Sequence, residues 1–73
     1  MNTRDLEILR AISALHKEGM RNIGRRLIEL KLNKNFRNKT INNIAFLGFL
    51  EGDEETGWVL TAKGAAALRR EGP

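Results

Sequence analysis

KNFRNKTINNIAFLGFL, residues 34–50, is the stretch from which the organisation of the whole chain follows. Its first half is polar and basic, and its second half is apolar. The spacing of Ile41, Ile44 and Leu47 or Gly48 predicts a helix over residues 37–47, because side chains three and four apart share one helix face. The opposite face would then carry side chains that point to solvent or to a ligand, namely Asn38, Lys39, Asn42 and Asn43.

These side chains suit the recognition of base edges in DNA. An asparagine amide offers one donor and one acceptor, which matches the edge that adenine presents in the major groove, whereas lysine and arginine match guanine or phosphate. The stretch therefore predicts one helix with a buried side and a base-contacting side.

Size and composition limit what the rest of the chain can be. A chain of 73 residues forms one domain, over residues 1–73, with a core that is only marginally sufficient, so self-association as a homodimer is expected. The absence of cysteine excludes a disulfide framework and a thiolate zinc site and is compatible with a reducing cytoplasm. Neither a membrane span nor a signal peptide is evident, so we expect a soluble cytoplasmic protein without a cofactor.

Charge is distributed unevenly along the chain, although the net charge is only +4. Residues 21–39 contain seven basic residues against Glu29 alone, a net charge of +6, whereas residues 51–55 carry four acids and no base. A basic concentration just before and within the helix is typical of a surface that meets a polyanion. A solvated charged face is the alternative interpretation.

Residues 3–18 predict the first helix. Asn2 or Thr3 can cap its start, and Gly19 can adopt the left-handed conformation that ends helices. His16, the single histidine, falls at the end of this helix, and no second ligand type clusters with it. We interpret it as a surface or helix-terminal residue and not as a catalytic or metal-binding one.

A second helix is predicted over residues 21–32, with Asn22 as its cap and Ile23, Leu27 and Leu30 on its buried face. Gly24 would lie inside this helix, where glycine is unfavourable. Either another helix comes close at this point, or the glycine is simply tolerated.

Two short apolar runs around a polar loop predict a β-hairpin over residues 49–60. We expect Trp58 to anchor the core and not to stack on a base, because the other aromatic residues do not alternate with the basic ones. The four acids of the loop are interpreted as solvated, since catalysis or metal binding needs a shaped, buried pocket. No catalytic motif is found, and we expect no enzyme.

Thr61 is expected to cap a last helix over residues 61–70. Its alanines allow close approach by a neighbour. They can pack against the first helix or form the seam of a homodimer.

The predicted fold is mainly α with a small β-hairpin, in the order helix, helix, helix, strand, strand, helix. This order resembles the winged helix-turn-helix domains of small bacterial, archaeal and phage regulators. Three segments carry the resemblance: IGRRL at residues 23–27, INNIAFLGFL at 41–50 and WVLTAKGAAAL at 58–68. The second resembles a recognition helix with its exit into the wing, and the third resembles a wing strand followed by a closing helix.

The resemblance implies sequence-specific binding of double-stranded DNA by a transcriptional regulator, as a homodimer on a two-fold site. Contacts to bases or to the adjacent backbone would come from Arg37, Asn38, Lys39, Thr40, Asn42 and Asn43. Phosphate contacts would come from Arg21, Asn22, Lys34 and Asn35, with Arg25 and Arg26 as neighbours.

The acidic loop departs from the family pattern, in which the wing often reaches DNA through basic residues. Glu51, Asp53, Glu54 and Glu55 would be repelled by phosphates, so the wing is expected to stay off the DNA. The alternative function is therefore a winged-helix module that binds a protein of the transcription or replication machinery. It would use the acidic hairpin or the C-terminal helix.

Overall fold

The computed structural model describes residues 2–70, and Met1 and residues 71–73 of the expected domain lie outside this part. The elements follow the order α1 (Thr3–Lys17), α2 (Arg25–Leu32), α3 (Asn38–Phe46), β1 (Leu50–Asp53), β2 (Gly57–Leu60) and α4 (Ala62–Arg70). The protein is thus mainly helical with one antiparallel two-stranded hairpin, as the sequence predicts.

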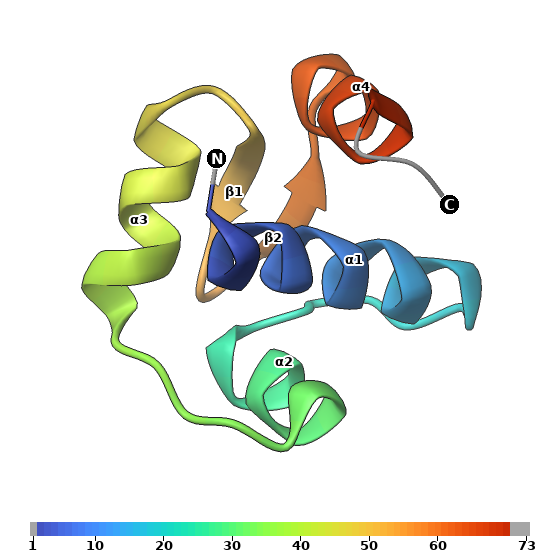
Figure 1. The fold of residues 1–73 in the computed structure, drawn as a ribbon. Helices are drawn as coiled ribbons and strands as arrows, with labels where there is room; N and C mark the ends of the chain where they lie inside the picture. Colours follow the sequence, from blue (N-terminus) through green and yellow to red (C-terminus); the bar gives the residue numbers. More distant parts are fainter. Residues whose placement is uncertain (1, 71–73) are drawn as a thin grey trace.

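Helix α1 crosses the middle of the molecule, and the other elements lie around it (Figure 1). The predicted cap is confirmed, because the Asn2 side-chain oxygen accepts a hydrogen bond from the Asp5 N–H at 2.8 Å. Ile8, Leu9 and Ile12 of α1 are fully buried. At about 1.5 to 3 kcal/mol for each such side chain removed from water, this helix supplies much of the core.

Helix α2 begins at Arg25, later than the predicted start at residue 21. Asn22 does not cap it, because its φ of 56° places its backbone in the left-handed region. Gly24 is the N-cap, in an extended conformation, and not an interior residue. The predicted start was too early because the chain makes a turn between α1 and α2, and Asn22 adopts the left-handed conformation in that turn.

The buried face of α2 also differs from the prediction. Ile28 is fully buried, whereas the side chain of Leu30 is 74 % exposed. Ile23 is buried, but it lies in the extended segment before α2 and therefore does not mark a helix face. Its carbonyl accepts a hydrogen bond from the Trp58 N–H at 2.8 Å, so this segment runs beside the hairpin.

The hairpin pairs β1 with β2, with Leu50 opposite Leu60 and Asp53 opposite Gly57. Trp58 is buried, which confirms its predicted core role, and Val59 on the other face of the strand is partly exposed. Gly57 has a φ of +94°, and a Cβ atom there would lie 2.5 Å from the Asn22 Cα. The first residue of β2, at the tip end of the hairpin, therefore packs directly on the turn before α2.

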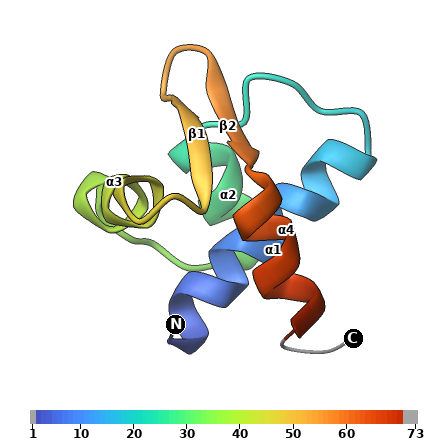
Figure 2. The ribbon, with the colours of Figure 1, turned by 90° about the horizontal axis from the view of Figure 1, so that it is seen from above.

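Helix α4 closes the fold on the other side of the hairpin from α3 (Figure 2). As predicted, Thr61 caps it: its Oγ accepts from the Gly64 N–H at 3.1 Å. A Cβ atom at Gly64 would lie 2.1 Å from the Phe49 carbonyl oxygen, so only glycine permits this approach. Ala67 and Leu68 pack, partly buried, against the core, as expected of an apolar face that meets the rest of the domain.

Candidate nucleic-acid interface

Helix α3 presents one buried side and one exposed side. Ile41 and Ile44 are 0 % and 1 % exposed, and they hold the helix on the core. The opposite side carries four exposed side chains at spacings of three, four and seven residues, which share one face. We call this set the α3 outer face; it consists of Lys39, Asn42, Asn43 and Phe46.

Two other residues of the predicted base-contacting set lie off this face. Thr40 is half-buried, at the margin of the helix. Asn38 is exposed at the first position of α3, but its place in the helical cycle is to one side of the outer face. Leu47, predicted to be buried, is the C-cap and 47 % exposed.

The start of α3 is electropositive. Arg37 is the exposed N-cap residue, and the first turn contains no acidic side chain. The free backbone N–H groups at a helix start carry partial positive charge, to which Arg37 and Lys39 add two full charges. This end of the helix favours an anionic partner.

The end of α3 is anchored by the start of α4. Lys63 donates from Nζ to the Leu47 carbonyl at 2.8 Å, and Thr61 donates from Oγ to the Gly48 carbonyl at 2.5 Å. The Lys63 Nζ also lies 4.7 Å from the centre of the Phe49 ring. These contacts satisfy carbonyls that a helix end leaves without partners and fix the direction of α3.

The turn that leads into α3 is held by an ionic hydrogen-bond network. Arg25 donates from Nη1 to the Phe36 carbonyl at 2.7 Å and pairs with Glu29 at 3.5 Å, and Glu29 accepts from the Phe36 N–H at 2.8 Å. The intramolecular partners of Arg25 therefore account for a basic residue at this position, and no phosphate contact is needed to explain it.

The other basic residues in and beside α2 and α3 differ in whether they form an ion pair. Lys31 pairs with Glu18 at 2.6 Å, and Lys34 pairs with Glu7 at 3.1 Å. By contrast, within residues 2–70 no ion pair involves Arg26, Arg37 or Lys39. Arg26 lies with Lys34 and Asn35 around one surface depression beside the turn that precedes α3.

Arg21 and Asn22 are not brought together with α3. They are exposed and line a shallow depression with Thr56 and Gly57 at the hairpin. The segment that contains them starts at the end of α1 farthest from α3 in both ribbon views (Figures 1 and 2). The predicted phosphate set therefore occupies two separate places.

Glu54 of the hairpin has a structural role that the sequence did not indicate. Its two carboxylate oxygens accept from the Arg25 N–H at 2.9 and 3.1 Å, and its Oε2 also accepts from the Trp58 indole N–H. Gly24 has no side chain to cap α2, and a Cβ there would lie 3.3 Å from the Glu54 Oε1. The acid therefore caps α2 in place of the N-cap residue.

Asp53 is the second acid of the hairpin with defined partners. Its Oδ1 accepts from the N–H groups of Glu55 and Thr56 at 2.8 and 2.7 Å and from the Thr56 hydroxyl at 3.1 Å. These bonds, chiefly those from Thr56, hold the pKa of the Asp53 carboxyl below its ordinary value. The loop acids are solvent-exposed, in line with their interpretation as solvated, but Asp53 and Glu54 also have structural partners that the sequence did not indicate.

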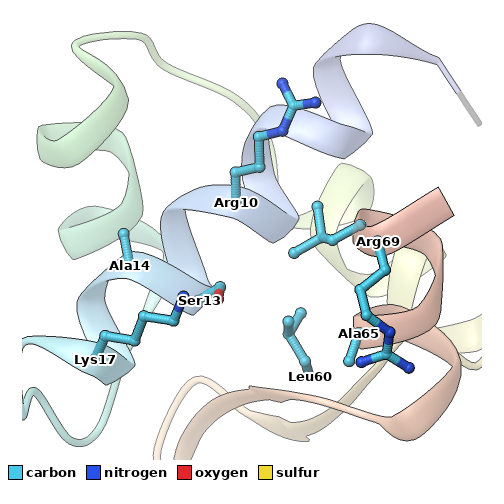
Figure 3. A pocket seen from close by; sticks show the side chains of 8 residues that line it. Arg10, Ser13, Ala14, Lys17, Leu60, Ala65 and Arg69 are labelled. Carbon is cyan, nitrogen blue, oxygen red and sulfur yellow. The ribbon is translucent and has the colours of Figure 1, made fainter. Parts of the chain in front are cut away.

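A broad groove of about 910 Å³ lies between α1 and α4 (Figure 3). Its floor is apolar and includes Leu60, Ala65 and Leu68. Three basic side chains stand around this floor, those of Arg10, Lys17 and Arg69. Because α3 and α4 lie on opposite sides of the hairpin, this groove is separate from the α3 outer face (Figure 2).

No protein-family model matches the chain, and neither a curated protein nor a solved structure is significantly similar to it. Among the described residues, no group of three or more His, Cys, Asp or Glu side chains is arranged to hold a metal ion. None of the helices within residues 2–70 has the length and apolar character that a membrane span requires.

Proposed function

We propose that this protein is a winged helix-turn-helix domain that binds double-stranded DNA sequence-specifically, as a transcriptional regulator. One observation carries the proposal: Lys39, Asn42 and Asn43 stand exposed on α3, directly opposite two fully buried isoleucines. An α-helix with its side chains is about 10–12 Å across, which matches the width of about 12 Å of a major groove. The asparagine amides would contact base edges, and no catalytic step is involved.

Phosphate contacts are proposed for Arg26 and Arg37, which have no ion pair within residues 2–70, and for their neighbours Lys34 and Asn35, of which Lys34 also pairs with Glu7. Arg37 lies at the start of α3, and Arg26, Lys34 and Asn35 lie around the depression before it. Three of these groups directly precede α3 in the chain, where contacts to phosphate would position the helix on the duplex. Arg21 and Asn22 beside the hairpin would reach phosphate only at a distance from α3.

A homodimer on a two-fold DNA site is part of the proposal, because one module of this size buries little surface on DNA. The groove between α1 and α4 is a poor seam for it. A two-fold axis through the groove would bring Arg10, Lys17 and Arg69 close to their own copies, and like charges repel.

The same groove favours the second candidate function, an interaction module that binds a protein through the C-terminal helix. An apolar floor beneath three basic side chains suits an acidic segment with apolar anchors. The hairpin suits such a partner less well, since Glu54 and Asp53 are bonded within the domain.

One pair of charge-matched variants separates the two functions. Arg37→Glu with Lys39→Glu should lower DNA retention more than tenfold, whereas Arg10→Glu with Lys17→Glu, which changes the net charge equally, should leave most of it. Retention is measured by fluorescence anisotropy on duplex DNA at several salt concentrations, where log Kd should rise steeply with log salt for the unmodified protein. Equal retention by both variants would contradict the DNA-binding proposal.

A further inference from the structure

Phe46 is the most exposed large apolar side chain among the described residues, with 87 % of its surface accessible. It is the last residue of α3. It follows Lys39 by seven residues, Asn42 by four and Asn43 by three, so it shares the α3 outer face with them and forms the C-terminal end of that face. Leu47 and Val59 are far less exposed, at 47 % and 39 %.

The polar neighbours of Phe46 limit what can cover it. A protein surface that buried the ring would also bury the Lys39 ammonium and two asparagine amides, which is costly unless each of them gains a partner. A DNA major groove offers such partners in its base edges and phosphates, and it offers one apolar group, the C5-methyl of thymine. This surface therefore matches the whole face.

We propose that Phe46 determines specificity by packing on a thymine methyl group in the major groove. This inference rests on the proposed DNA-binding function. Four residues of helix advance about 6 Å along the axis, and successive base pairs are about 3.4 Å apart. The thymine therefore lies within two base pairs of the base that Asn42 contacts, and the target contains this thymine at a fixed offset.

Replacing thymine by deoxyuridine tests the proposal, because it removes the methyl group and leaves the hydrogen-bonding edge unchanged. The preferred duplex is first obtained by selection from random DNA with the unmodified protein, and each thymine is then replaced in turn. One replacement should weaken binding about fourfold, the effect of losing one buried methyl group.

Phe46→Ala should bind the thymine and deoxyuridine duplexes with equal affinity, and Phe46→Leu should keep part of the difference. Val59→Ala serves as the matched control, since it truncates an exposed apolar side chain on the hairpin. It should keep the full fourfold difference. Circular dichroism and a mass measurement accompany each variant, so that changes in folding or assembly are recognised.

Two results would overturn the inference. The first is equal binding of every deoxyuridine duplex by the unmodified protein. The second is an undiminished deoxyuridine effect in Phe46→Ala; if this variant also loses self-association, the ring belongs to a subunit contact. In both cases the protein still selects a DNA sequence, so the proposed function stands, whereas a folded protein that selects no sequence would remove both.

Discussion

The α3 outer face and the hairpin tip are both polar and charged in sequence, yet the structure uses them in opposite ways. At the tip, Asp53 and Glu54 accept four hydrogen bonds from backbone N–H groups, with both contacts of the Arg25 N–H counted, and one each from the Thr56 hydroxyl and the Trp58 indole N–H. On the outer face, no hydrogen bond within residues 2–70 involves the side chains of Lys39, Asn42 or Asn43.

The difference separates polar groups that build the domain from those left for a ligand. Replacing a bonded group should change the free energy of unfolding, because its partners are left unsatisfied. Replacing a group without partners should change binding alone.

Gly57→Ala tests whether the tip end of the hairpin is fixed against the turn before α2. A Cβ at Gly57 would lie 2.5 Å from the Asn22 Cα, so we expect a loss of about 3 kcal/mol in the free energy of unfolding. Gly19→Ala is the matched control: φ is similar, +88° against +94°, but no atom lies within 4 Å of the added Cβ, so the loss should be about 1 kcal/mol. Urea denaturation followed by Trp58 fluorescence measures both. Equal losses would show that the close approach is absent.

Glu54→Ala tests the cap that the hairpin supplies to α2. Two backbone contacts to the Arg25 N–H and the indole partner would be lost, with an expected cost of about 1 to 3 kcal/mol. Glu55→Ala, one residue further, removes a side chain without a hydrogen bond in the described part of the chain and should change stability by less than about 0.5 kcal/mol. Thermal and urea unfolding compare them. If the two variants were equally stable, the tip would be no more structural than the outer face.

Asn42→Ala tests whether the α3 outer face serves binding and not stability. Loss of a bidentate contact should reduce discrimination between the best duplex and one with a substituted base pair by about 1 to 3 kcal/mol. Unfolding should change by less than about 0.5 kcal/mol, because the side chain is exposed. Thr40→Ala, at the half-buried margin of α3, should leave base preference unchanged. A stability loss in Asn42→Ala without a change in preference would reverse the assignment of the face.

The smallest effect concerns acid pH at the hairpin tip. Because hydrogen bonds lower the pKa of Asp53 in the folded protein below its ordinary 3.8, the ionised carboxylate stabilises the fold above that pH. This contribution should disappear as the pH falls through the lowered folded value. Carboxyl NMR titration checks the direction, and Asp53→Asn should lack this component of acid unfolding. A carboxyl that titrates above 3.8 would contradict it.

Local patterns were sufficient where a residue acts on its chain neighbours. The Asn2 and Thr61 caps, the buried pair Ile41 and Ile44, and the core position of Trp58 each depend on spacings of two to four residues. These spacings are visible in the sequence, and they sufficed to predict the element order and the polar side of α3.

Long-range contacts explain what the sequence did not predict. Glu54 caps Arg25 across 29 residues, and Arg25 bonds Phe36 across 11, so neither role leaves a local signal. The start of α2 was predicted too early for a related reason. Asparagine is a residue type that often caps helices, but tertiary packing places Asn22 in a left-handed turn. Charge counting alone could not separate the paired Lys31 and Lys34 from Arg37 and Lys39.

The hairpin is tied at its base through Thr61 and Gly48 and at its tip through Glu54 and Arg25. Because contacts at both ends fix the length of the hairpin, inserting or deleting one residue in either strand would break one of these two contacts. Descendants of this sequence should therefore conserve the strand lengths strictly, while the outward side chains of α3 diverge as their targets change.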